Sequence, residues 1–155
     1  MKKLELPLSA QELVPHRETM LLIDQLLTYD RDQGSGRISA GIAPDTVFCD
    51  RGISGEDNFL EEVVVLEMMA QAYACLRGYE DRLAGKPPSL GFLVGVRHFA
   101  AQRRVEIASK FTIAVVTTIK LADFFIADAV VKSGAETIAA AELKIWVPPV
   151  EDSAN

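Results

Sequence analysis

The segment Val63–Leu76, which reads VVVLEMMAQAYACL, constrains the fold more than any other part of the chain. A helix with this sequence is apolar on nearly every side, and such a helix is stable only when the fold buries it. Its two larger polar side chains, Glu67 and Gln71, are four residues apart and share one helix face with small residues such as Ala70 and Ala74. The sequence thus predicts a central helix with one polar pair on an otherwise apolar face.

Glu67 is the candidate catalytic residue of this segment. Burial among apolar side chains raises the pKa of a carboxyl group, because it disfavours the charged form. A carboxyl group that titrates closer to neutrality suits general acid–base catalysis. A glutamate at the edge of a helix stripe, with its carboxylate in water, is the simpler structural interpretation.

Length and composition limit the class of protein. The chain has 155 residues, of which 49% are hydrophobic and 25% charged, which fits one domain over residues 1–155 with a real core. A net charge of −6 argues against a general nucleic-acid binder, because such proteins are usually basic. No apolar run has the length of a signal peptide or of a membrane span, so we expect a cytoplasmic protein.

The cysteines and histidines do not form a metal-binding pattern. The two cysteines, Cys49 and Cys75, lack metal-ligand spacing, and a disulfide is not expected in a reducing compartment. Cys75 fits a small core residue, and Cys49 falls in a predicted loop. The two histidines, His16 and His98, are too few for a histidine-rich site, and His98 fits a surface position near a strand end. We therefore expect no metal ion.

Turn formers and β-branched residues predict the remaining elements. Before the helix these are a lead-in over residues 1–14 with a short helix at Ser9–Leu13, a strand or helix at Met20–Tyr29, a turn at Arg31–Gly36, a strand at Arg37–Ala43 and a long loop at Pro44–Asn58. Ser9 is expected to cap the short helix, and Asp57 or Asn58 the long one, which ends near Arg77 at Gly78 or Gly85.

After the helix the sequence predicts a run of antiparallel strands. They are Leu90–Phe99, Arg104–Leu121, Phe124–Lys132 and Thr137–Val147, with a flexible C-terminal tail over residues 149–155. A curved antiparallel sheet wrapped around the apolar helix would bury it, which places the chain in the α+β class. A single sheet leaves open edges, so we expect dimerisation edge to edge.

Two segments resemble the bacterial 3-hydroxyacyl-(acyl carrier protein) dehydratases, which have the hot-dog fold. VPHRETMLLIDQL at Val14–Leu26 resembles their N-terminal signature, and VLEMMAQA at Val65–Ala72 resembles their helix segment. LGFLVGV at Leu90–Val96 looks like the strand after the helix. The resemblance covers nearly the whole chain, and its nearest match is the dehydratase-like branch of aryl-polyene-type clusters.

The resemblance implies a reaction and a place for Glu67 in it. In the family a histidine removes the C2 proton of a 3-hydroxyacyl thioester, and the helix carboxyl protonates the departing C3 hydroxyl. The two groups come from opposite subunits, and backbone N–H groups near the helix start stabilise the thioester oxygen. Glu67 stands at the carboxyl position and Gln71 follows it. No organic cofactor is implied, since the substrate arrives on the carrier protein's phosphopantetheine arm.

The chain departs from this pattern at the histidine. The family's loop histidine falls at Ile53, and no histidine lies anywhere near it; the family's glycine at the helix start falls near Glu62. Three explanations stay open. A hot-dog partner supplies the histidine, His16 or another local group replaces it, or the protein is a non-catalytic acyl-binding or scaffold subunit. A hot-dog thioesterase, with Glu67 acting on the thioester carbonyl, is a further alternative.

Two sets of residues are expected to contact the substrate and its carrier. Leu66, Met69 and Phe92 would line a tunnel for the acyl chain between helix and sheet. Gln71 would hold or orient Glu67 and contact the substrate. Arg97, Arg103 and Arg104 form a basic stretch that would dock the acidic carrier protein, although a solvated strand turn explains them equally well.

Overall fold

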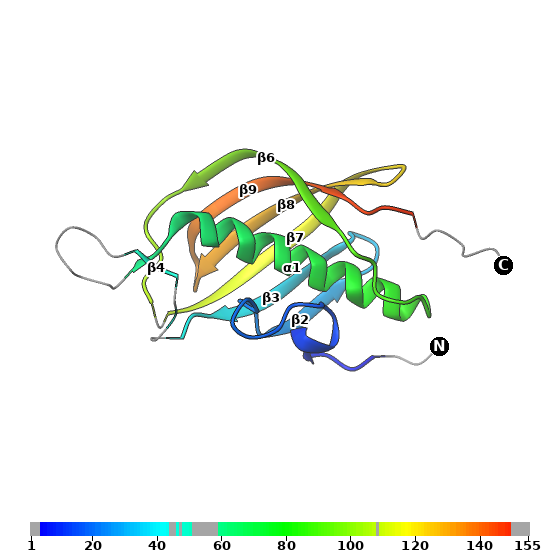
Figure 1. Ribbon diagram of the computed structural model, residues 1–155, viewed down its shortest axis with the longest axis horizontal. Helices are drawn as coiled ribbons and strands as arrows, with labels where there is room; N and C mark the ends of the chain where they lie inside the picture. Colours follow the sequence, from blue (N-terminus) through cyan, green and yellow to red (C-terminus); the bar gives the residue numbers. More distant parts are fainter. Residues whose placement is uncertain (1–3, 44–45, 47, 51–58, 108, 150–155) are drawn as a thin grey trace.

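One long helix crosses one face of a curved antiparallel sheet (Figure 1). The computed structural model describes residues 4–43, 46, 48–50, 59–107 and 109–149. The elements in chain order are β1 (Leu8–Ser9), a short 3-10 helix (Ala10–Glu12), β2 (Gln25–Asp30), β3 (Ser35–Gly41), β4 (Cys49–Asp50), β5 (Phe59–Leu60), α1 (Glu62–Leu83), β6 (Phe92–Ala101), β7 (Lys110–Leu121), β8 (Phe124–Ser133) and β9 (Glu136–Trp146). This arrangement confirms the α+β class.

The seven-stranded sheet has the order β1-β2-β3-β7-β8-β9-β6, and β4 pairs with β5 in a separate ribbon. Tight hairpins join β7 to β8 and β8 to β9, since Leu121 pairs with Phe124 and Ser133 with Glu136. α1 and the segment after it carry the chain from the β5 ribbon to β6, at the far edge of the sheet. Within the described residues, β1 and β6 are therefore the two edge strands.

The core forms where α1 meets the inner face of the sheet. Met68, Met69 and Leu76 of α1 are fully buried, as are inward-pointing strand residues such as Ile113 and Leu143. The strands alternate buried and exposed positions, which is the pattern of a sheet with one covered face. Cys75 is buried here too, and burial raises the pKa of its thiol to about 12.

α1 runs beyond Arg77 and ends at the second of the two glycines predicted to stop it, Gly85 rather than Gly78. The helix continues to Leu83, and Gly85, at φ 68°, provides the left-handed turn that terminates it. Gly78 instead allows a close approach: a Cβ at this position would lie 2.0 Å from the Leu13 carbonyl oxygen. The glycine is thus required by the N-terminal segment that packs against the helix.

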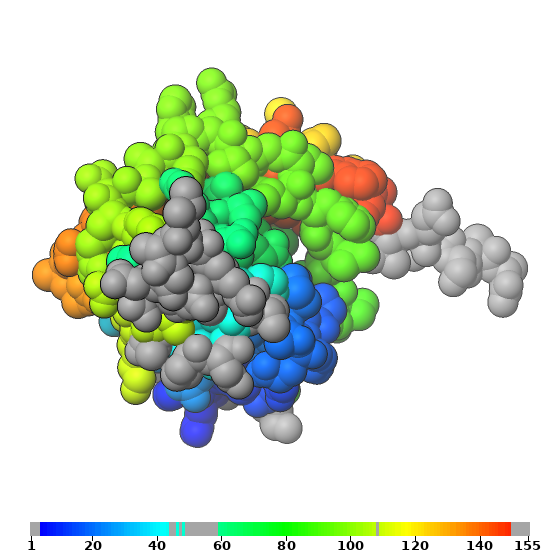
Figure 2. All heavy atoms as spheres, turned by 60° about the vertical axis from the view of Figure 1, so that its left-hand side comes forward, coloured from blue at the N-terminus to red at the C-terminus, as the bar shows by residue number. Residues whose placement is uncertain are grey.

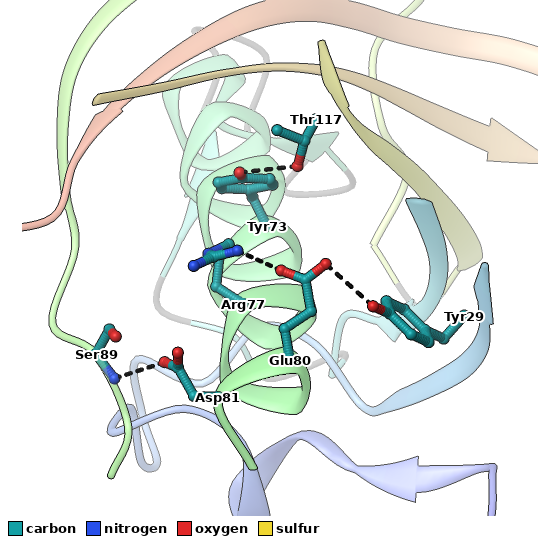
Figure 3. A network of polar contacts seen from close by, with 7 residues as sticks. All are labelled: Tyr29, Tyr73, Arg77, Glu80, Asp81, Ser89 and Thr117. Atoms are coloured by element: carbon teal, nitrogen blue, oxygen red, sulfur yellow. Dashed lines mark hydrogen bonds and ion pairs between the residues drawn. The ribbon is translucent and has the colours of Figure 1, made fainter. Parts of the chain in front are cut away.

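Four polar contacts fix the second half of α1 to its surroundings (Figure 3). Tyr73 and Thr117 of β7 share a hydrogen bond of 3.0 Å between their hydroxyls, and Asp81 accepts one of 2.9 Å from the Ser89 backbone N–H. Arg77 pairs with Glu80, whose other carboxylate oxygen accepts a 3.3 Å hydrogen bond from the Tyr29 hydroxyl. These contacts define how the helix lies against β2 and β7.

Several predicted boundaries differ from the structure. Ser9 precedes a 3-10 helix but makes no side-chain cap hydrogen bond. Only the second half of Met20–Tyr29 is a strand, and Cys49 lies in the short strand β4 rather than in a loop. β7 begins at Lys110, later than the predicted Arg104. The proposed helix caps Asp57 and Asn58, Ile53, and residues 150–155 of the expected tail lie outside the described residues.

Candidate functional site

A pocket of about 190 Å³ follows the face of α1 that carries Glu67 and Gln71. His16, from the segment before β2, lines it at one side, and Phe92 and Leu93 at the start of β6 line the other. Ile145 and Val147, at the end of β9, complete the apolar part of its wall. The pocket therefore combines polar groups of the helix and N-terminal segment with an apolar wall from the sheet.

Gln71 fixes the polar end of this pocket. Its Nε2 donates hydrogen bonds to Glu67 Oε1 at 2.9 Å and to the Met20 carbonyl at 2.7 Å, and its Oε1 accepts one from the Leu22 backbone N–H at 2.9 Å. Reversing the amide would set its oxygen against two acceptors, so the three bonds define its orientation. The side chain is only 1% exposed, and it ties the segment before β2 to the helix while holding one oxygen of Glu67.

His16 faces the same oxygen of Glu67. His16 Nε2 lies 3.7 Å from Glu67 Oε1, while His16 Nδ1 is buried without a hydrogen-bond partner. The tautomer with its proton on Nε2 fits this geometry best, because the N–H then faces the carboxylate and no N–H is buried without an acceptor. Held this way, His16 supports Glu67 and offers no lone pair to a substrate in the pocket.

Arg17, which follows His16 in the N-terminal signature segment Val14–Leu26, shapes the loop that carries His16. Its Nη1 donates to the carbonyl oxygens of Val14 at 2.9 Å and of His16 at 2.7 Å. These hydrogen bonds hold the backbone of residues 14–17 in a compact turn, and this turn determines the position of the His16 imidazole. Asp24, at the end of the signature, lies away from the pocket; burial raises its pKa, and Lys110 nearby partly opposes that shift.

Glu67 is less enclosed than its apolar sequence context predicts. Its side chain is 40% exposed, because no other part of the described chain covers this side of α1. Val63, one turn earlier, is 65% exposed, and Leu93 and Val94 of the edge strand β6 are 39% and 50% exposed. The pocket thus opens toward a surface of exposed apolar side chains. Figure 2 shows β6, in light green, along the upper side of the molecule and the N-terminal segment, in blue, along the lower side.

The structure brings together only some of the residues expected to contact an acyl chain. Gln71 and Phe92 line the pocket with Glu67. Met69 is fully buried in the core, and neither it nor Leu66 lines the pocket. Ala70 and Ala74 take their place on the helix, since they lie on the same face as Glu67.

The three arginines expected to dock a carrier do not form one patch. Arg103 and Arg104 line a second pocket, of about 300 Å³, beside the start of α1, together with Leu60 and Val65. Arg103 pairs with Glu136 at 3.0 Å, and the Arg104 guanidinium lies 4.3 Å from the centroid of the Phe59 ring. Arg97 is exposed on β6 and does not line this pocket.

Other expected residues lie outside both pockets. His98 is exposed, within β6 rather than at a strand end, at a bulge where it adopts φ 55°. In the described part of the chain, no group of three or more His, Cys, Asp or Glu side chains is placed to hold a metal ion. No helix of the same residues has both the length and the apolar character needed to cross a bilayer.

Solved structures share the fold of this chain. The chain is similar to one in the dehydratase heterocomplex ApeI:P from Xenorhabdus doucetiae, with a TM-score of 0.80, 20% identity and coverage of 92% of this chain and 93% of the other. It is also similar to the uncharacterised protein PH1136 from Pyrococcus horikoshii, with a TM-score of 0.62, 12% identity and coverage of 93% and 95%.

A putative thioesterase from Ralstonia eutropha aligns with a TM-score of 0.59 and 10% identity over 79% of this chain and 83% of the other. These likenesses, with the single helix across the sheet, confirm the hot-dog fold. A comparison with curated protein sequences gave no match. A family model described as ApeP-like, ApeP dehydratase, matches residues 8–155. Since this match covers nearly the whole chain, the protein belongs to the ApeP-like dehydratase family.

Proposed function

We propose that the protein is one subunit of a two-chain dehydratase. The complex would remove water from a (3R)-3-hydroxyacyl thioester on the phosphopantetheine arm of an acyl carrier protein, in a fatty-acid or polyene pathway. The observation that carries this proposal is Glu67, held by Gln71 in the wall of a pocket that opens onto exposed apolar residues. A carboxyl group in that position suits proton transfer once a partner covers it.

Glu67 would act as the acid of the elimination. A base removes the C2 proton of the substrate, the electrons of that C–H bond form the C2–C3 double bond, and the C3–O bond breaks. The Glu67 carboxyl gives its proton to the departing hydroxyl, which leaves as water. Gln71 would hold one carboxylate oxygen, so that the other faces the pocket.

The base would come from the partner subunit. His16 is a poor base here, since its Nε2 faces Glu67 and its Nδ1 is buried. The segment 51–58, where the family's histidine falls, contains no histidine. A heterocomplex is the form in which the similar ApeI:P dehydratase was solved, which supports assembly with a second hot-dog chain. That partner would pair with the edge strand β6 and cover Val63 of α1.

The carrier protein would dock beside the start of α1. Arg103 and Arg104 place two guanidinium groups in this pocket, against one lining carboxylate, that of Glu62, and Arg103 is paired with Glu136. Carrier proteins are acidic, so these arginines would contact them. Glu62 in this pocket lies about 7.5 Å along the helix from Glu67 and about 140° around it, so a pantetheine arm entering here would have to pass around the start of α1 to reach the catalytic pocket.

The test is dehydration of a 3-hydroxyacyl carrier protein, followed by mass spectrometry for loss of water. We expect no turnover by the chain alone, turnover when the pathway's other hot-dog protein is added, and loss of that turnover in Glu67→Gln. Glu5→Gln, at an exposed glutamate that lines neither pocket, serves as the matched control and should keep activity.

Other outcomes would replace the proposal. Turnover by the pure chain would assign the base to a group of this chain, with His16 the first to substitute. Full activity of the Glu67→Gln complex would make this chain a non-catalytic subunit. Release of the free acid instead of the enoyl product would identify a thioesterase.

A further inference from the structure

The face of the sheet turned away from α1 carries a row of large apolar side chains at one end. Leu121, Phe124, Trp146 and Phe92 are successive register partners on β7, β8, β9 and β6, so their side chains share this outer face. They are 71%, 39%, 37% and 45% exposed, in that order. A contiguous row of large apolar residues in water is typical of a protein–protein contact surface.

The other end of the same face is lined by small side chains. Ala114, Val130, Ala140 and Ala100 are register partners on the same four strands. Val130 and Ala140 each lie an even number of residues from the aromatic row on their strands, so they point the same way. A shallow depression of about 490 Å³ extends from this row over β2, β3, β7 and β8, and its lining includes Ala114, Asp128 and Val130.

Charged residues separate the two rows. Lys144 of β9 lies next to the aromatic row, over the ring of Phe124 at 4.9 Å. Asp128 of β8, Glu142 of β9 and Arg97 of β6, which are successive register partners, lie next to the row of small residues. The face therefore runs from the large apolar row, through the positive charge of Lys144, then a row with two carboxylates and one guanidinium, to the small and hollowed row.

Such a face is complementary to itself in one orientation. A two-fold axis that runs across the strands places the aromatic row of one copy over the small row and hollow of the other. It also places Lys144 of each copy against Glu142 of the other. An axis along the strands would set Asp128 and Glu142 of both copies together, and like charges repel.

We propose that a second copy of this chain docks back to back on this outer face, with the two sheets stacked and the strands of the two copies running in opposite directions. The contact is isologous, as in most two-fold assemblies. Of the residues that line the catalytic pocket, the contact involves only Phe92. It leaves the helix side free for another subunit, so an assembly with a different partner would contain two copies of this chain.

The single tryptophan of the chain, Trp146, reports on this contact directly. We expect the full-length protein to associate with rising concentration in sedimentation measurements. Over the same concentration range Trp146 emission should shift to shorter wavelength and become less sensitive to acrylamide, because the indole leaves water. Phe124→Ser should weaken the association at least tenfold.

A charge exchange tests the orientation. Lys144→Glu and Glu142→Lys should each weaken association at least tenfold at low salt, and the double variant should restore it to within about threefold of the parent, since each ion pair is reformed with reversed signs. Lys86→Glu, an exposed charge after α1, is the control and should change nothing. Circular dichroism of each variant verifies that it is folded.

Three results would overturn the proposal. The first is a chain that stays monomeric at all concentrations and contributes a single copy to its complex with a partner. The second is association that leaves the Trp146 emission unchanged, which would assign the contact to the β6 edge. The third is a double variant that associates as weakly as the single ones.

Discussion

At the scale of single residues, Gln71 is the main organiser of the site. Its side chain makes hydrogen bonds with two backbone groups and with one carboxylate oxygen of Glu67. We expect Gln71→Leu to lower the free energy of unfolding by about 1–3 kcal/mol, since the Leu22 N–H and the Met20 carbonyl lose their partner. Urea denaturation measures this loss. Activity of the complex should fall as well, because Glu67 is released. Gln102→Leu, at an exposed position, should alter neither, and an equal loss in both variants would contradict the assignment.

Asp24 should make stability depend on pH. Burial raises the pKa of its carboxyl in the folded state above the ordinary value of 3.8. A raised folded-state pKa favours folding only at low pH, and this contribution is lost as the pH rises through the folded value. Asp24→Asn removes the titration, so it should be more stable than the parent at pH 7, with an advantage that shrinks as the pH falls toward 3.8. Thermal unfolding at several pH values measures this. A variant less stable at pH 7 would show that attraction to Lys110 dominates.

The residue pattern predicts the polar pair but not its surroundings. Helical spacing suffices to place Glu67 and Gln71 on one face, and the structure has them hydrogen-bonded. The same geometry explains why Leu66 and Met69 do not line the pocket: they lie about 100° and 200° around the helix from Glu67. The approach of His16 could not be predicted, because it depends on a loop closed by Arg17.

At the scale of elements, the strands were largely predictable from alternating apolar residues, whereas their ends were not. The residues before Lys110 have strand composition but pair with β5 instead of the large sheet: Leu60 N–H donates to the Val105 carbonyl, and Phe59 bridges to Glu106. A strand pairs with a segment that is distant in the sequence, so the local sequence does not determine which segment that is. In the same way, Met20 and Leu22 look strand-like but give their backbone groups to Gln71.

The end of α1 offers a prediction for the packing of a whole element. Gly78→Ala should destabilise the protein by about 1–3 kcal/mol despite alanine's higher helix propensity, because the new methyl group overlaps the Leu13 carbonyl oxygen and the N-terminal segment must move. Gly95→Ala, whose Cβ would meet its neighbour at an ordinary 3.6 Å, is the matched control. Chemical denaturation of both variants measures the difference, and a stabilised Gly78→Ala protein would mean that the segment around Leu13 yields at no cost.

At the scale of the whole molecule, the chain has two exposed apolar surfaces with different expected occupants. The surface beside the catalytic pocket includes Val63, and the outer face of the sheet ends at Leu121, and these two side chains are 65% and 71% exposed. Because both are in water in the single chain, replacing either with glutamate should leave its folding intact. The same substitution therefore isolates the effect on each contact.

We expect Val63→Glu to weaken binding of the different hot-dog partner at least tenfold and to reduce dehydration in parallel, because an unpaired carboxylate would be buried between the subunits. Self-association followed through Trp146 should be unchanged. Leu121→Glu should do the reverse: it should abolish the Trp146 shift and leave partner binding and activity at the parent level. For both variants, titration of labelled partner measures partner binding, sedimentation measures self-association and the dehydration assay measures activity. If one substitution disrupted both contacts, the two surfaces would be parts of a single interface, and the separation of heteromeric from homomeric docking would be wrong.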